Sequence, residues 1–236
     1  PTDVRSFLME MAILGFVDYD TQRELVFMRP KMRNFLLANS KKQDYDIIQF
    51  QSLTNSKNNA KLNLMNFDLH IYGVKEIFLS DSQYVSVYPR GEEIILKKNR
   101  DFEFGGLVRA GLFDFNASQC RFNYEHFKID MNIIDSLMLY VEDKSQQPNY
   151  MGEYPLVLVK NSIQDIKGYI EIDEPNNKSS TKYTPKYPIY TSTSPGGVYY
   201  DKPEIFKGVY KRDKFYFRVL PFKLERLDDF ETDSIE

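Results

Sequence analysis

Residues 62–141 alternate between apolar and polar side chains, and Gly, Asn or Asp interrupts the alternation every few residues. The clearest segments are residues 84–88, 101–104, 112–115, 121–124 and 127–131. A period of two places the large apolar side chains on one face of a half-buried strand. The paired aromatic residues should therefore point together into a core: Phe102 with Phe104, Phe113 with Phe115, and Phe122 with Tyr124. The pattern predicts a mainly β fold.

Two architectures accommodate many short strands without helices between them. An antiparallel sandwich needs tight reversals, and residues 89–91 (Pro-Arg-Gly) are the one good turn signal in this stretch. A β-solenoid, whether parallel β-helix-like or built of stacked short strands, needs only short bends. Gly105, Gly106 and Gly111 would then occupy corners, with positive φ or a neighbouring coil close by. The spacing favours the β-solenoid.

Residues 1–45 differ from the rest of the chain and predict a small N-terminal helix-hairpin-helix unit. Apolar residues at helical spacing open the chain, and Gly15 stands where that helix would stop. Residues 16–19 and 25–28 are typical of a hairpin, and Pro30 suits the first turn of a second helix. We interpret this unit as a cap or as a winged-helix-like domain.

Basic residues in this unit raise the alternative that it binds nucleic acid. They are Arg23, Arg29, Lys31 and Arg33. Acidic residues lie in the same supposed wing and would repel phosphate: Asp18, Asp20 and Glu24. The formal net charge of −3 also provides no global basic field. We therefore expect a packing module with a solvated basic face and no nucleic-acid partner.

The remainder of the chain divides into two expected regions. Residues 46–145 form the β-solenoid-like region, and the polar stretch at 146–149 (Gln-Gln-Pro-Asn) marks its end. Residues 146–236 continue the β structure. Within them, residues 173–195 are rich in Asn, Ser, Thr, Lys and Pro, which predicts a long exposed loop.

Several short motifs carry a resemblance to a family of proteins. They are 104–111 (Phe-Gly-Gly-Leu-Val-Arg-Ala-Gly), 122–124 (Phe-Asn-Tyr), 127–130 (Phe-Lys-Ile-Asp), 176–179 (Asn-Asn-Lys-Ser) and 198–201 (Val-Tyr-Tyr-Asp). With a composition rich in Lys, Asn, Ile and Tyr, the chain resembles a segment of large, poorly characterised β-solenoid proteins of Bacteroidetes. The resemblance covers most of the chain. It implies a structural role in a bacterial protein and carries over no catalytic residue.

The single cysteine and the lack of long apolar runs limit what the chain can be. Cys120 alone cannot form an internal disulfide, and its alternating context predicts a small buried residue. No apolar run reaches the ~18 residues of a membrane helix, and no signal peptide is visible. Because the chain opens on Pro1, we expect a fragment of a longer protein. Its compartment is not fixed by these features, and a cell-envelope or extracellular location is the working hypothesis.

Candidate catalytic and metal-binding residues are few. His70 and His126 each lack a second His or Cys nearby, which argues against zinc. Parallel β-helices often carry two acids that flank a glycosidic bond. The acids that would suit such a site are Asp81, Asp101, Asp114, Asp130 and Asp135. Outward polar residues are expected on strands in any case, so we interpret these acids as solvated. The sequence thus predicts no catalytic residue, no cofactor and no metal.

Tyrosines near the C-terminal end offer a binding hypothesis. Sugar rings stack on exposed aromatic faces. The tyrosines that would form such a platform are Tyr183, Tyr187, Tyr190, Tyr199 and Tyr200. The alternative is that they fasten a long loop to the flank of the fold.

The function expected from these features is that of a non-catalytic structural or interaction segment of a larger bacterial protein. The alternative is a carbohydrate-active or glycan-binding β-helix module. The expected partners are the rest of a longer parent chain and a glycan or protein. Exposed strand edges also predict self-association.

Overall fold

The computed structural model describes residues 4–40, 48, 50–55, 58–80, 82–159, 161–179, 182–201, 203 and 206–230. The chain forms two compact units, the first from residues 1–47 with 176–181 and the second from 48–175 with 182–236. Each unit is described by itself.

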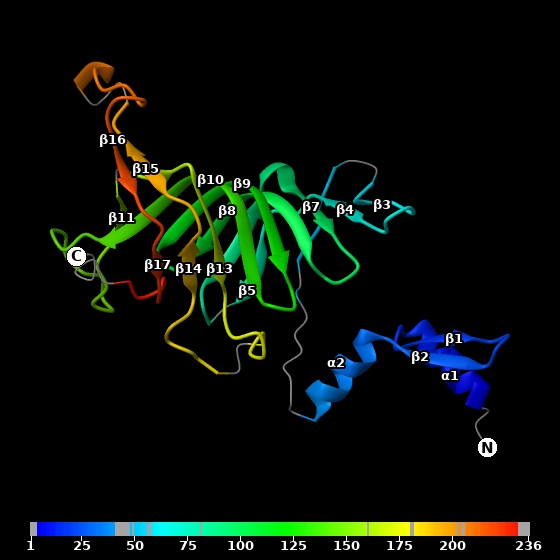
Figure 1. The fold of residues 1–236 in the computed structure, drawn as a ribbon. Coiled ribbons are helices and arrows are strands. Elements are labelled where there is room, and N and C mark those ends of the chain that lie inside the picture. Colours follow the sequence, from blue (N-terminus) through cyan, green and yellow to red (C-terminus); the bar gives the residue numbers. More distant parts are fainter. Residues whose placement is uncertain are drawn as a thin grey trace. The chain divides into compact units, whose positions relative to one another are not determined.

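The N-terminal unit confirms the predicted order of helix, hairpin and helix (Figure 1). Its elements are α1 (Val4–Ile13), β1 (Val17–Asp20), β2 (Leu25–Met28) and α2 (Pro30–Asn39). Gly15 follows α1 with φ of +74°, a conformation that glycine adopts without penalty. In the hairpin turn, the Asp20 carboxylate accepts hydrogen bonds from the backbone N–H groups of Gln22 and Arg23, at 3.0 and 3.1 Å. The winged-helix-like character of this unit stays a prediction.

The second unit is built from short strands around three long ones. The strands are β3 (Ala60–Leu62), β4 (Leu69–Tyr72), β5 (Ile77–Ser80), β6 (Val85–Pro89), β7 (Glu93–Leu96), β8 (Phe102–Ala110), β9 (Phe113–Asn123), β10 (Lys128–Glu142), β11 (Leu156–Leu158), β12 (Ile163–Gln164), β13 (Ile166–Glu171), β14 (Ile189–Ser192), β15 (Gly196–Tyr199), β16 (Tyr216–Val219) and β17 (Lys223–Leu224). Two 3-10 turns interrupt them, at Arg90–Glu92 and Phe206–Gly208.

The long strands β8, β9 and β10 form an antiparallel meander (Figure 1). Gly111 and Leu112 alone connect β8 to β9, and four residues, 124–127, connect β9 to β10. The two outer strands of the meander, β8 and β10, each pair with further strands. One end of β8 pairs with β7 and the other with β6, while β10 pairs with β9 on one side and with β11, β12 and β13 on the other.

Register shifts inside the meander reset the alternation of buried residues. Phe104 pairs with Cys120, but Gly106 pairs with Ala117, so β9 carries an extra residue between these pairs. The inward positions of β9 accordingly change phase between Ala117 and Cys120, and Phe122 continues the new phase. A bulge bends a strand and changes which side chains face inward. The long strands can therefore keep one face on the core while they curve.

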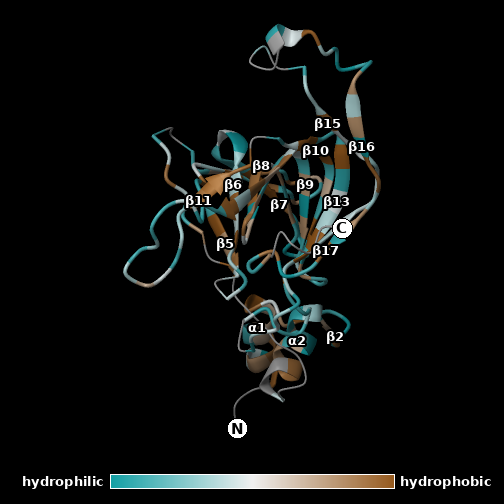
Figure 2. Ribbon diagram, turned by 90° about the vertical axis from the view of Figure 1, so that its left-hand side faces the viewer, coloured by the Kyte–Doolittle hydropathy of each residue, from teal (hydrophilic) through white to brown (hydrophobic). Residues whose placement is uncertain are grey.

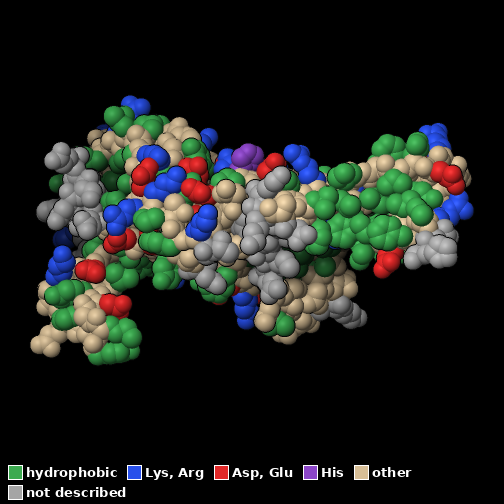
Figure 3. All heavy atoms as spheres, turned by 90° about the horizontal axis from the view of Figure 1, so that it is seen from below, with side chains coloured by type: hydrophobic (Ala, Val, Ile, Leu, Met, Phe, Trp, Pro, Cys, Tyr) green, Lys and Arg blue, Asp and Glu red, His purple; other side chains and the backbone are tan. Residues whose placement is uncertain are grey.

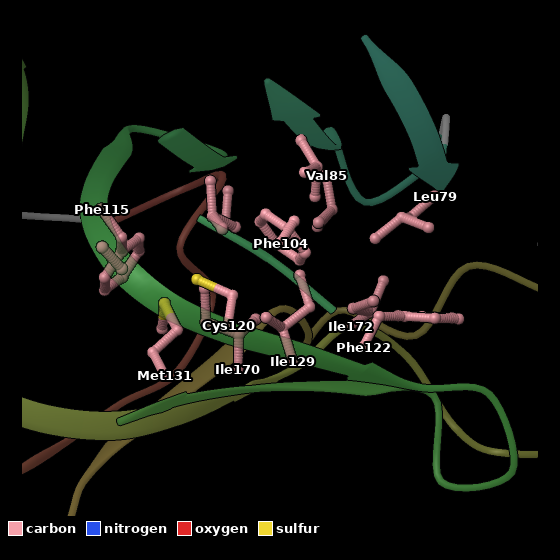
Figure 4. Packing of buried hydrophobic residues seen from close by; sticks show 14 of the residues in the cluster. Leu79, Val85, Phe104, Phe115, Cys120, Phe122, Ile129, Met131, Ile170 and Ile172 are labelled. Atoms are coloured by element: carbon pink, nitrogen blue, oxygen red, sulfur yellow. The ribbon is translucent and has the colours of Figure 1, made fainter. Parts of the chain in front are cut away.

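The core lies between the meander and the β5–β6 pair (Figure 4). Leu79 and Val85 reach in from β5 and β6, opposite Phe122, Ile129 and Ile170 (Figure 4). The predicted inward pairs are confirmed, since all six are at most 7% exposed: Phe102, Phe104, Phe113, Phe115, Phe122 and Tyr124. Fully burying a side chain of this size stabilises the fold by roughly 1.5–3 kcal/mol. The alternating pattern identified the core correctly.

The predicted parallel pairing of a β-solenoid is wrong, because every pairing among the described strands is antiparallel. Antiparallel neighbours need only a two-residue connection, whereas parallel neighbours need a crossover of a dozen or more residues. The apparent turn at Pro89 does not close a hairpin. It leads instead from β6 to β7, which pair with opposite ends of β8.

The predicted long exposed loop at 173–195 is wrong over its C-terminal part. Residues 189–192 form β14, which pairs with β13 and β17, and Tyr187, Ile189 and Tyr190 are buried. The composition of this stretch favours a loop, but the apolar pair Ile189 and Tyr190 packs into the core. The boundary expected near residue 145 falls between β10 and β11, inside one compact unit.

Candidate interaction surfaces

The N-terminal unit exposes most of its apolar side chains. Among the described side chains of residues 4–40, Val17 alone is buried. The exposed large apolar residues, which we call the N-terminal apolar surface, are Val4, Phe7, Met9, Ile13, Leu14, Leu25, Val26, Phe27, Met28, Phe35 and Leu36. In Figure 3, hydrophobic side chains (green) gather over this unit, at the right-hand end of the picture. Large exposed apolar patches on soluble proteins commonly belong to interaction sites or ligand grooves.

A few contacts hold the helices and the hairpin together. The rings of Phe16 and Phe35 meet edge to face with centroids 5.4 Å apart. The Lys31 ammonium lies 4.9 Å from the centroid of the Phe16 ring and donates to the carbonyl of Leu14 at 2.6 Å. These contacts orient the elements but bury little area, so the apolar side chains of both helices and of β2 remain in water.

The basic residues of this unit largely meet acids of the same unit. Arg29 pairs with Asp18, and the hydrogen bond from its guanidinium holds the pKa of the Asp18 carboxyl below its ordinary value. Arg23 lies 3.9 Å from Asp20. Pairing of this kind lowers the positive charge that could attract phosphate. The expectation that this unit has no nucleic-acid partner stays a prediction.

Two of the tyrosines considered for glycan stacking are buried. Tyr190 is fully buried, with its ring centroid 4.8 Å from that of Phe115 and 5.7 Å from that of Phe222. Burial raises the pKa of the Tyr190 hydroxyl. Tyr187 is 6% exposed. Neither ring can stack on a glycan from outside this fold.

The other tyrosines do not form one platform. Tyr183 is exposed, and its hydroxyl donates to Asp228 at 3.4 Å. Tyr199 stacks on Tyr216 with centroids 5.6 Å apart, whereas Tyr200 contacts other rings. Because successive residues of a strand point to opposite faces, Tyr199 and Tyr200 lie on opposite sides of their hairpin. Tyr199 and Tyr200 are therefore neighbours in sequence that share no face on which a sugar ring could stack.

Strands β15 and β16 carry an aromatic cluster on each face. We call these two strands, with the described residues between them, the aromatic hairpin. On one face the Tyr200 ring meets Phe215 and Phe217, with centroids 5.8 and 5.9 Å apart. The tilted ring of Tyr210 contacts Phe215 with centroids 4.7 Å apart. Sequence reasoning identified a strand here but not a surface. The signal was that residues 215–217 (Phe-Tyr-Phe) are apolar on both faces, with no polar alternation.

A charged cluster fastens the base of the aromatic hairpin. The Arg212 guanidinium carbon lies 3.5 Å from the centroid of the Tyr199 ring, and Arg212 pairs with Asp165 at 2.7 Å. The Tyr199 hydroxyl donates to the same carboxylate at 2.9 Å. Burial would raise the pKa of Asp165, but the hydrogen bonds from Arg212 and Tyr199 outweigh it and the pKa lies below its ordinary value. The cluster holds the hairpin in one orientation.

Two of the acids expected to be solvated are buried instead. Asp114 is 3% exposed and accepts hydrogen bonds from Arg109 at 2.8 and 2.9 Å and from the Tyr140 hydroxyl at 3.1 Å. Asp101 is 1% exposed and accepts from Arg121 at 2.9 Å and from the backbone N–H of Tyr124 at 2.9 Å. Both carboxylates therefore have structural partners.

The remaining acids of the carbohydrate hypothesis are also engaged. Asp130 pairs with Lys128 at 2.9 Å. Asp135 accepts from Ser118 at 2.7 Å and lies 3.4 Å from Arg90. Asp81 lies outside the described residues.

An open pocket of about 600 Å³ lies on the outer face of β7, β8 and β9. Its acids are Glu93 and Glu103, which pair with His70 at 3.1 Å and with Lys97 at 3.0 Å. Cys120 lines it, and burial raises the pKa of that thiol to about 12. The thiol is therefore protonated at neutral pH and a poor nucleophile. The paired acids and the protonated thiol give the pocket no group poised for catalysis.

In the described part of the chain, no group of three or more His, Cys, Asp or Glu side chains is arranged to hold a metal ion. Neither of the two helices in that part has the length and apolarity needed to cross a membrane.

Comparison of the chain with protein-family models, with curated proteins and with solved structures finds no match.

Proposed function

We propose that this chain is a non-catalytic interaction segment of a larger bacterial protein, and that the N-terminal apolar surface binds another protein surface. One observation carries the proposal: residues 4–40 leave their large apolar side chains in water. Removing apolar side chains from water favours association.

The arrangement of charges supports a protein partner. Arg29 and Asp18, and Arg5 and Glu24, pair within the unit, so the charges around the apolar residues are already compensated. A surface of this composition resembles the core and rim of a protein–protein interface, where apolar residues fill the centre and polar groups surround them.

Site-specific photo-crosslinking in the longer protein, in its native cells, tests the proposal. A photoreactive phenylalanine analogue replaces Phe27 or Ile13, which are 58% and 86% exposed. A control places it at Met65, which is 92% exposed on the other unit. We expect one discrete protein adduct from positions 27 and 13 and none from position 65. Equal adducts from all positions, or none from 27 and 13, would refute the proposal.

The glycan-binding alternative is favoured by one observation, the exposed rings of the aromatic hairpin. Tyr187 and Tyr190 are buried and cannot contact a glycan, so only the other tyrosines remain for this function. Glycan binding stays a prediction. Titration with a panel of soluble polysaccharides, monitored by tyrosine fluorescence, distinguishes glycan binding from protein binding.

A further inference from the structure

Strand β16 is an exposed edge of the large sheet. Among the described strands, β15 alone pairs with it. Figures 1 and 2 both show β15 and β16 side by side and reaching beyond the neighbouring strands. The short strand β11 overlaps β16 in Figure 1 but lies on the opposite side in Figure 2, so it does not cover this edge. One side of the β16 backbone is therefore available for pairing.

This edge has few of the features that keep edge strands apart. Proteins protect such edges by keeping the strand short or with charged residues, prolines or bulges. In β16, Arg218 is the one charged residue, and Tyr216 and Phe217 are 48% and 61% exposed. Aromatic and β-branched residues also favour strands. β16 is short, with four residues, but its side chains favour pairing over repulsion.

We propose that β16 of one copy pairs antiparallel with β16 of a second copy and joins two sheets across a two-fold axis. A second copy is preferred over an unrelated strand because residues 215–219 are self-complementary when two copies pair antiparallel. In an antiparallel pair, opposite residues lie on the same face of the sheet. A two-fold axis therefore passes through one residue position, which meets its own copy.

Charge selects one register. An axis at Arg218 would place two arginines opposite each other, and an axis at Tyr216 would place Lys214 opposite Arg218. Like charges in opposite positions are destabilising. An axis at Phe217 avoids both. It pairs Phe217 with its own copy, Tyr216 with Arg218 of the other copy, and Phe215 with Val219 of the other copy.

The side-chain contacts that this register creates between the two copies are attractive. Aromatic rings opposite each other attract, and an arginine beside a tyrosine ring forms a cation–π contact. The rings of Tyr200 and Phe215 already pack around Phe217, so the pairing would continue one aromatic surface across the axis. The interface lies away from the N-terminal apolar surface in the chain, so the failure of one proposal leaves the other standing.

Single cysteines test the register. Opposite residues have Cα atoms about 4.5–5.5 Å apart, within the range that a disulfide spans. In the proposed register this holds for Phe217→Cys. Copies of residue 216, or of residue 218, would lie about 8 Å apart, given strand rise and spacing, which is too far. The native Cys120 is buried and does not compete.

We expect the full chain to sediment as a dimer, and Phe217→Cys to form a disulfide-linked dimer on mild oxidation at least tenfold faster than Tyr216→Cys or Arg218→Cys. Phe217→Lys should weaken the dimer at least tenfold, because two ammonium groups meet at the axis. Met65→Lys, an equally exposed control elsewhere, should leave it unchanged. A chain that stays monomeric at high concentration, equal linking by all three cysteines, or a dimer indifferent to Phe217→Lys would each overturn the proposal. Far-UV circular dichroism confirms that each variant folds.

Discussion

At the scale of single residues, the alternating pattern predicted the core but not the outer face. Phe113 and Phe115 point inward as expected, and the same period places Asp114 between them on the other face. That face is covered locally, because Arg109 and Tyr140 lie over the carboxylate. A pattern of period two states which face a residue takes. It does not state whether side chains of neighbouring strands will cover that face, since this depends on pairing that is distant in sequence.

The covered carboxylate has a measurable consequence. Asp114→Asn removes the charge that Arg109 contacts through two nitrogen atoms, and we expect it to lower the free energy of unfolding by about 2 kcal/mol. Asp130→Asn serves as the control, because its pairing with Lys128 is partly exposed and is worth less than about 1 kcal/mol. Urea denaturation measures both. Equal effects would show that the Asp114 contacts contribute nothing beyond a surface pair.

Glycines also differ from one another at this scale. Gly111 has φ of +55°, and a Cβ there would lie 2.2 Å from the carbonyl oxygen of Leu227. Gly91 has φ of +71°, and no atom lies within 4 Å of such a Cβ. Gly91→Ala should therefore cost only the backbone strain, about 1–2 kcal/mol. Gly111→Ala should cost at least twice as much, because backbone must move. Thermal unfolding of both variants checks this, and equal losses would contradict it.

At the scale of elements, local patterns were sufficient for the N-terminal unit and insufficient for the sheet. A helix stop at Gly15, a hairpin turn at Asp20 and a helix start at Pro30 depend on neighbours in sequence. The partners of β6 and β7 do not. These strands are joined by a short turn, yet each pairs with a different end of β8. Sequence spacing favoured stacked parallel strands because short gaps occur in both architectures.

We expect the N-terminal unit to bind hydrophobic dyes through its exposed apolar side chains. We expect the double variant Phe27→Ser and Ile13→Ser to reduce the fluorescence of bound anilinonaphthalene sulfonate by at least half. Their side chains are 58% and 86% exposed, so the unfolding free energy of the second unit should stay within ~0.5 kcal/mol. Met65→Ser, on the other unit, should leave the fluorescence unchanged. A variant that binds as much dye as the original chain would show that the surface is not apolar in solution.

At the scale of the whole molecule, composition and period indicated a mainly β chain, and the antiparallel topology came only from the structure. The binding surfaces were harder to predict for the same reason. Tyr190 and Tyr200 share a tyrosine-rich stretch, yet Tyr190 is buried beside Phe115 while Tyr200 joins the aromatic hairpin. Exposure depends on which strands the chain brings together, and no local signal records it.

The central claim is that residues 4–40 present apolar surface and lack a core of their own, while β8, β9 and β10 contribute to the packed core of the second unit. Hydrogen–deuterium exchange of the chain, followed by peptide mass spectrometry, tests this most directly. Short helices without tertiary packing are marginally stable in water, and buried strands open only with global unfolding. We therefore expect amides of α1 and α2 to exchange at least a hundredfold faster than those of β9. Equal protection of α1 and β9 would contradict the account, because it would show that the N-terminal unit is already packed.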